Sequence, residues 1–189
     1  SGVLAWIGIT VMFFATGRLA EARIGALVAS DNPAAKTLDL VSTPLPANPI
    51  CREVFVVQIV GDHYVVRKAA HSLAPGWLPA ADCPMRAAGE ASTAAWRPPA
   101  ASTNAELHWV GELVMPGGLL GDLSKQFCSV RALLHFARVP WAQQLDAGWI
   151  VGDLRYDREP EPGFAEIETA SGADECPRII PGWIPPRSD

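Results

Sequence analysis

The clearest pattern of hydrophobic and polar positions is a pair of β-prone runs on either side of Gly61-Asp62. E-V-F-V-V-Q-I-V precedes this pair and H-Y-V-V-R-K follows it, and a two-residue loop that begins with Gly is typical of a hairpin. Such a loop pairs Val60 with His63 and Val57 with Val66. Because side chains alternate along a strand, one face is predicted to enter the core, with Phe55, Val57, Ile59, Tyr64 and Val66. The other face is predicted to meet water or a partner, with Val56, Gln58, Val60, His63, Val65 and Arg67.

The N-terminal stretch Ser1–Gly17 contains no charged side chain. As a helix it rises about 25 Å, against a hydrocarbon core of roughly 30 Å. We expect residues 1–30 to form a hydrophobic and juxtamembrane helix that contacts the inner membrane through residues 2–17. A buried or interfacial helix and a signal peptide are the alternatives.

The charges that follow this apolar run predict the side of the membrane on which the rest of the chain lies. Arg18 and Arg23 place that end in the cytoplasm by the positive-inside rule, with a periplasmic location as the alternative. Leu19, Arg23 and Ala26 are predicted to share one side of the helix, which Asp31-Asn32-Pro33 should end.

The remaining pattern predicts a soluble α+β domain over residues 37–189. Its expected strands are Thr37–Ser42, the hairpin, Glu106–Val114, Gly148–Tyr156 and Phe164–Thr169, with a long loop over Ser72–Thr103 that holds one short helix. One amphipathic helix is predicted from a stripe at three- and four-residue steps, made of Leu120, Leu123, Phe127, Val130 and Leu134. We expect one antiparallel sheet with this helix packed on one face.

Composition narrows the function classes. With 189 residues, 49% of them hydrophobic, the chain has material for one sizeable core. A formal net charge of −5 without any run of Lys or Arg argues against a nucleic-acid-binding protein, but it does not argue against a protein partner.

Most of the four cysteines, Cys51, Cys83, Cys128 and Cys176, are predicted to be buried free thiols. Cys83 and Cys176 form the best disulfide candidate, provided the compartment is oxidising.

Candidate chemistry is sparse. His63, His71, His108 and His135 match no metal-ligand spacing, so we expect no metal or cofactor within these residues. The candidate polar site consists of Asp153, Arg155, Arg138 and His63. Asp153 and Arg155 share one strand face, where they either form a cross-strand ion pair or meet a ligand. Arg138 precedes Val139-Pro140, where it either caps a helix end or serves a site. No catalytic residue is assigned.

Six segments carry a resemblance through their order and spacing. The first is the apolar N-terminal helix with Arg18 after it, and the others are P-L-P-A-N-P-I-C-R-E-V from Pro44, G-D-H-Y from Gly61, L-L-H-F-A-R-V-P from Leu133, G-D-L-R-Y from Gly152 and P-G-W-I-P-P-R from Pro181. Together they resemble the C-terminal half of the bacterial inner-membrane, metal-dependent hydrolases of the YdjM type, a family associated with LexA. Cys51 departs from the pattern, which has Trp after N-P-x-x.

The resemblance implies that the chain is the soluble C-terminal domain of a membrane-bound hydrolase. The family's metal-binding histidines lie in an H-R-x-x-T-H-S-like segment among N-terminal membrane helices, and that segment has no counterpart here. A divalent metal is therefore expected in the longer protein and outside these residues. The alternatives are a non-catalytic, membrane-tethered binding or regulatory module, and a soluble enzyme that uses Asp153, Arg155 and a histidine.

Overall fold

A computed structural model describes residues 2–45, 48–85, 92, 94–100, 103–157 and 163–170. The first sheet has the order β1-β2-β3-β4, with β1 Lys36–Leu45, β2 Asn48–Val60, β3 His63–Ser72 and β4 Leu107–Pro116. The second has the order β5-β6-β7, with β5 Pro140–Leu145, β6 Gly148–Asp153 and β7 Glu166–Ala170. The helices are α1 Gly2–Asp31, α2 Leu119–Gln126, α3 Cys128–Leu134 and the 3-10 helix η1 Ala80–Asp82. The predicted α+β class is confirmed, with two antiparallel sheets where one was expected.

The predicted hairpin is confirmed in its register, since Val60 pairs with His63 and Val57 with Val66. Its core face joins a continuous apolar cluster that extends into α2, α3 and the second sheet. The opposite face does not meet water as predicted. Val56 and Arg67 are buried on that face, because α1 lies across it.

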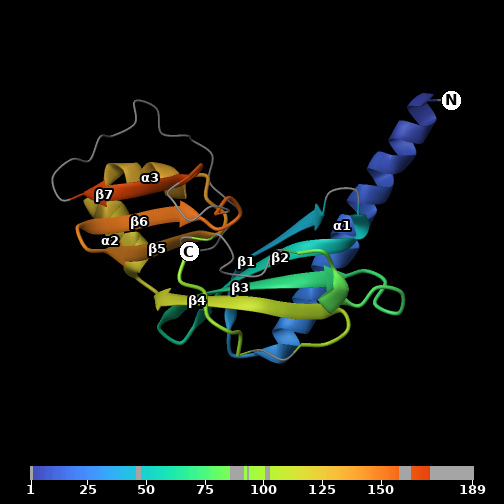
Figure 1. Cartoon of the computed structure of the whole chain (residues 1–189), viewed down its shortest axis with the longest axis horizontal. Coiled ribbons are helices and arrows are strands. Elements are labelled where there is room, and N and C mark those ends of the chain that lie inside the picture. The colour runs from blue at the N-terminus through green and yellow to red at the C-terminus, as the bar shows by residue number, and fades with distance from the viewer. Residues whose placement is uncertain are drawn as a thin grey trace.

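Helix α1 attaches to the first sheet through its C-terminal half and projects beyond the sheet with its N-terminal half (Figure 1). Ala20, Ile24 and Val28 recur every four residues and are buried against Val54, Val56 and Trp109. The predicted side with Leu19, Arg23 and Ala26 is the exposed side of this part of the helix. The helix does end at Asp31, as predicted.

The N-terminal half of α1 leaves its apolar side chains uncovered. Large side chains from Val3 to Phe14 are exposed, and the helix is long and apolar enough to cross a membrane or to act as a signal sequence. The structure therefore agrees with the expectation of a candidate membrane helix.

The predicted single amphipathic helix is divided at Phe127. This residue adopts an extended backbone (φ −120°, ψ 121°) between α2 and α3, while its amide still donates to the carbonyl oxygen of Leu123 (2.8 Å). The apolar stripe nevertheless packs into the main core through Leu120, Leu123, Val130 and Leu133. Strand β5 was not predicted, since its polar Gln143-Gln144 pair interrupts the apolar pattern.

The cysteines differ from expectation. Cys51 at the start of β2 is bonded to Cys83 just after η1, so the predicted Cys83–Cys176 pair is wrong. Cys128 is also disulfide-bonded, and the described residues contain no free thiol. Cys176, the segment from Pro181 and most of the connection between the predicted strands Gly148–Tyr156 and Phe164–Thr169 lie outside the described residues.

Candidate functional site

The predicted polar residues converge where β6 ends. Asp153 is fully buried, and its Oδ2 atom accepts hydrogen bonds from Nη2 of Arg155 (2.6 Å), Nε of Arg155 (2.9 Å) and the backbone N–H of Arg138 (2.9 Å). Its Oδ1 atom accepts from the backbone N–H of Arg155 (3.1 Å). Both carboxylate oxygens are therefore occupied by donors from the same fold.

Arg155 lies in the turn that follows β6 and not within the strand. This position lets its side chain fold back onto Asp153, so the ion pair is local and not the cross-strand pair that was predicted. The guanidinium also contacts the carbonyl oxygen of Phe136 (3.4 Å) and lies over the ring of Tyr156. Tyr156 in turn packs edge-to-face on Phe164.

The side chain of Arg138 points toward the first sheet. Its Nη2 and Nε atoms donate to the two carboxylate oxygens of Asp39 at 2.7 Å and 2.9 Å, a bidentate geometry. Arg138 therefore bridges the sheets, since its backbone holds Asp153 of β6 and its side chain holds Asp39 of β1. The predicted helix-cap role does not describe this guanidinium.

Sequence reasoning did not single out Asp39. Its signal was a carboxylate inside the β-prone segment T-L-D-L-V-S, where Asp is disfavoured. Asp39 pairs in register with Val57, whose side chain belongs to the main core, and this face of β1 is therefore turned toward Arg138.

The electrostatics of the cluster favour the charged guanidinium of Arg155. Burial lowers the pKa of Arg155, but hydrogen bonds and the negative charge of Asp153 outweigh burial, so its pKa is raised overall. Asp39 adds to this effect. Each carboxylate is held in place by the donors around it, and the cluster joins the two sheets.

His63 does not join this cluster. It lies at the start of β3, beside the hairpin turn, and its Nδ1 atom contacts Oδ1 of Asp62 (2.7 Å), with both side chains largely exposed. The structure thus brings together three of the four predicted polar residues.

A second buried charge cluster, also missed from the sequence, fastens the C-terminal end of α1. Arg67 contacts Asp31 of α1 (3.3 Å) and Glu112 of β4 (3.1 Å), and its guanidinium lies 5.7 Å from the ring centroid of Trp109. A sequence signal existed, since Arg67 and Glu112 are charged residues within predicted strands. Their direct pairing in the sheet places them side by side.

Two further polar groups are buried under α1. Arg52 donates from Nε to the hydroxyl oxygen of Ser42 (2.7 Å), and its cross-strand partner His71 donates from Nδ1 to the carbonyl oxygen of Glu106 (2.9 Å). Burial lowers the pKa of both side chains, an effect that Glu21 opposes at Arg52 and the Glu106 carbonyl opposes at His71. His71 is therefore neutral at pH 7.

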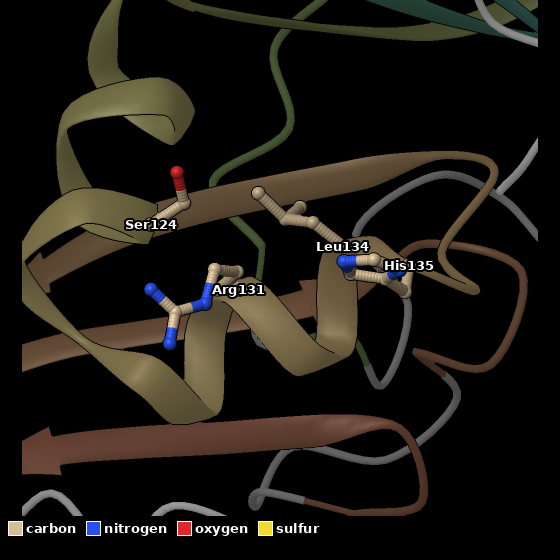
Figure 2. A pocket seen from close by; sticks show the side chains of 4 residues that line it. All are labelled: Ser124, Arg131, Leu134 and His135. Atoms are coloured by element: carbon tan, nitrogen blue, oxygen red, sulfur yellow. The ribbon is translucent and has the colours of Figure 1, made fainter. Parts of the chain in front are cut away.

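The helical layer of the second sheet carries a pocket of about 190 Å³. Figure 2 shows that Arg131, Leu134 and His135 reach it from α3 and its C-terminal end, opposite Ser124 of α2. The hydroxyl of Ser124 donates to the carbonyl oxygen of Gly121 (2.8 Å), so it is committed to its own helix. This arrangement does not form a nucleophile–base pair.

Within the part of the chain that the structure describes, no group of three His, Cys, Asp or Glu side chains is arranged to hold a metal ion. Comparisons with protein-family models, with characterised proteins and with solved structures find no match for this chain.

Proposed function

We propose that this chain is the membrane-anchored globular domain of an inner-membrane, metal-dependent hydrolase. The observation that carries the anchoring is the division of α1 into two halves. Its N-terminal half exposes large apolar side chains, whereas Ala20, Ile24 and Val28 of its C-terminal half are buried on the first sheet. Because α1 is continuous, its exposed apolar half is joined directly to the folded domain.

The hydrolase assignment rests on the resemblance to the YdjM-type family. Two segments that carry the resemblance, Leu133–Pro140 and Gly152–Tyr156, lie side by side. The backbone N–H of Leu154 donates to the carbonyl oxygen of Val139 (3.0 Å), and Asp153 accepts from Arg138. Because the two segments contact each other, the folded domain gives a structural reason for their order and spacing. Metal ligands would come from parts of the longer protein.

Metal analysis tests this assignment. The full-length protein should contain a stoichiometric divalent metal, whereas purified, tag-free residues 1–189 should contain none. A full-length protein without metal and without hydrolytic activity would contradict the assignment. About one zinc per chain in residues 1–189 would contradict the proposal that the metal site lies outside these residues.

The second candidate function is a non-catalytic, membrane-tethered binding or regulatory module. One observation favours it, namely that Asp153, Arg155 and Arg138 are engaged with protein partners. In that case Asp153→Asn in the full-length protein should alter stability but not the rate of any hydrolysis measured per folded molecule.

We further propose that the domain lies on the periplasmic side. The Cys51–Cys83 disulfide supports an oxidising compartment, because such bonds are rare in the cytosol. This placement opposes the expectation from Arg18 and Arg23, and two arginines are a weak orientation signal beside a covalent bond. Intact cells are treated with a membrane-impermeant reductant and then with a membrane-impermeant maleimide, which should label Cys51 and Cys83. If the two cysteines are labelled only after lysis, and without reductant, the domain lies in the cytoplasm.

A further inference from the structure

Strand β3 and the residue after it contact helix α1 at two points, and these contacts show which end of the first sheet lies nearest the apolar half of α1. Arg67, midway along β3, contacts Asp31 at the C-terminal end of α1 (3.3 Å). Leu73, just after β3, accepts a hydrogen bond at its carbonyl oxygen from Nη1 of Arg23 (3.4 Å). Strand β3 therefore runs antiparallel to α1 and heads toward its exposed N-terminal half.

A third contact gives the same direction. Nη2 of Arg52 lies 3.6 Å from the position that a Cβ atom on Gly17 would occupy, and Arg52 is paired with His71 in the sheet. The last residues of β3 are thus near the helical turn at which the uncharged run ends. The chain that continues past Ser72 lies at the membrane-facing end of the domain.

This continuation is a firmly held turn. The N–H groups of Trp77 and Leu78 both donate to the carbonyl oxygen of Ala74, at 2.9 Å and 3.0 Å. On one side Leu73 donates to the carbonyl oxygen of Ile50 (3.0 Å), and on the other the Cys51–Cys83 disulfide joins the end of η1 to β2. The backbone of the turn is therefore held in place on the domain.

The chemistry of the turn suits a lipid surface. Trp77 is 88% exposed, the highest exposure among the large apolar side chains of the described residues, and the segment L-A-P-G-W-L-P around it contains no charge. Tryptophan combines a large apolar ring with an N–H donor and is enriched where hydrocarbon meets headgroups. On the adjoining part of α1, Arg23 places a cation at the same end, and Arg18 is paired with Glu21 (3.1 Å).

We propose that the Trp77 turn, residues 73–79, enters the headgroup region of the bilayer that holds α1. The inference rests on the proposed membrane anchoring and deepens it. The domain would then contact the membrane at two points, the helix and the turn. Two contacts fix the orientation of the domain, whereas a single helix leaves it free to rotate about the helix axis.

Depth-resolved fluorescence quenching tests this proposal. The full chain is reconstituted into phosphatidylcholine vesicles that contain phosphatidylglycerol, with lipids brominated either near the headgroup or near the chain ends. Trp77→Phe and Trp6→Phe variants identify the emission of each ring by difference. Trp149→Phe is the matched control, since Trp149 lies in the second sheet on β6.

Trp77 should be quenched by the shallow bromines, so that Trp77→Phe loses most of the shallow quenching and Trp149→Phe loses none. Trp6, on the apolar half of α1, should be quenched by the deep bromines. Quenching of Trp6 without quenching of Trp77 would overturn the inference and leave the anchoring intact. Quenching of neither ring would overturn both.

Discussion

Arg138 donates two hydrogen bonds to the carboxylate of Asp39, a residue 99 positions earlier in the chain. Asp39 belongs to β1 at the edge of the first sheet, and Arg138 leads into β5 of the second. The same Arg138 donates its backbone N–H to Asp153. One residue therefore connects two buried carboxylates that belong to different sheets.

Asp39→Ala should lower the free energy of unfolding by roughly 3–5 kcal/mol, because it leaves a partly buried guanidinium without its partner. Chemical denaturation of the full chain in detergent measures the loss. Asp122→Ala is the matched control, since Asp122 pairs with Lys125 on an exposed helix surface and such pairs contribute little. Equal effects of the two substitutions would contradict a structural role for the Asp39–Arg138 pair.

Asp153→Ala should destabilise the domain by a similar amount, roughly 3–5 kcal/mol, because Arg155 and the N–H of Arg138 lose their acceptor together. Asp153→Asn should cost less, since the amide retains one acceptor oxygen. The melting temperatures of both variants provide the measurement. If Asp153→Ala left the melting temperature unchanged while abolishing activity of the full-length protein, Asp153 would serve a ligand.

Stability should fall as the pH drops below about 6.5, the ordinary pKa of histidine. The sign follows from His71, whose pKa in the folded state is lowered by burial. Below pH 6.5 the unfolded chain takes up a proton that the folded chain resists, so the stabilising contribution is complete above this pH and is lost below it. The slope for one group is at most about 1.4 kcal/mol per pH unit.

Comparing unfolding free energies at about pH 7 and about pH 5.5 in wild type and in a His71→Gln variant isolates this effect. His71→Gln should reduce the pH dependence, because it removes the buried imidazole whose pKa is lowered in the folded state. An identical pH dependence in wild type and His71→Gln would show that His71 does not cause it.

Reduction of the Cys51–Cys83 disulfide should lower the free energy of unfolding by about 2–4 kcal/mol, because it releases the constraint on a loop with a sequence separation of 32. The Cys51→Ser, Cys83→Ser double variant should show the same loss without reductant. Mass spectrometry of a non-reduced digest identifies the pairing. A peptide that joins Cys83 to Cys176 would contradict the structure.

Deleting residues 1–17 should yield a folded domain that needs no detergent, because Ala20, Ile24 and Val28 stay on the sheet. Circular dichroism and size-exclusion chromatography provide the measurement. Ile24→Asp in the same shortened chain should unfold it, since the substitution buries an unpaired charge. Unfolding caused by the deletion alone would mean that the apolar half of α1 belongs to the core.

The sequence by itself determined the structural elements that depend only on neighbouring residues. A Gly-Asp loop and alternating β-branched residues sufficed for the register of β2 and β3, because a two-residue turn leaves few alternatives. An uncharged run sufficed for the apolar half of α1. In the candidate site, Asp153 and Arg155 were identified from their shared face within a predicted strand, and Arg138 from its position before Val139-Pro140.

Only the tertiary structure decided which distant groups meet. The Asp39–Arg138 pair, the Cys51–Cys83 bond and the Arg67 cluster each join residues far apart in the chain. Spacing does not reveal such pairs, since each forms only when the packing of whole elements brings its ends together. The face of α1 that is buried was decided in the same way, because its apolar residues surround the helix and the sheet selects Ala20, Ile24 and Val28.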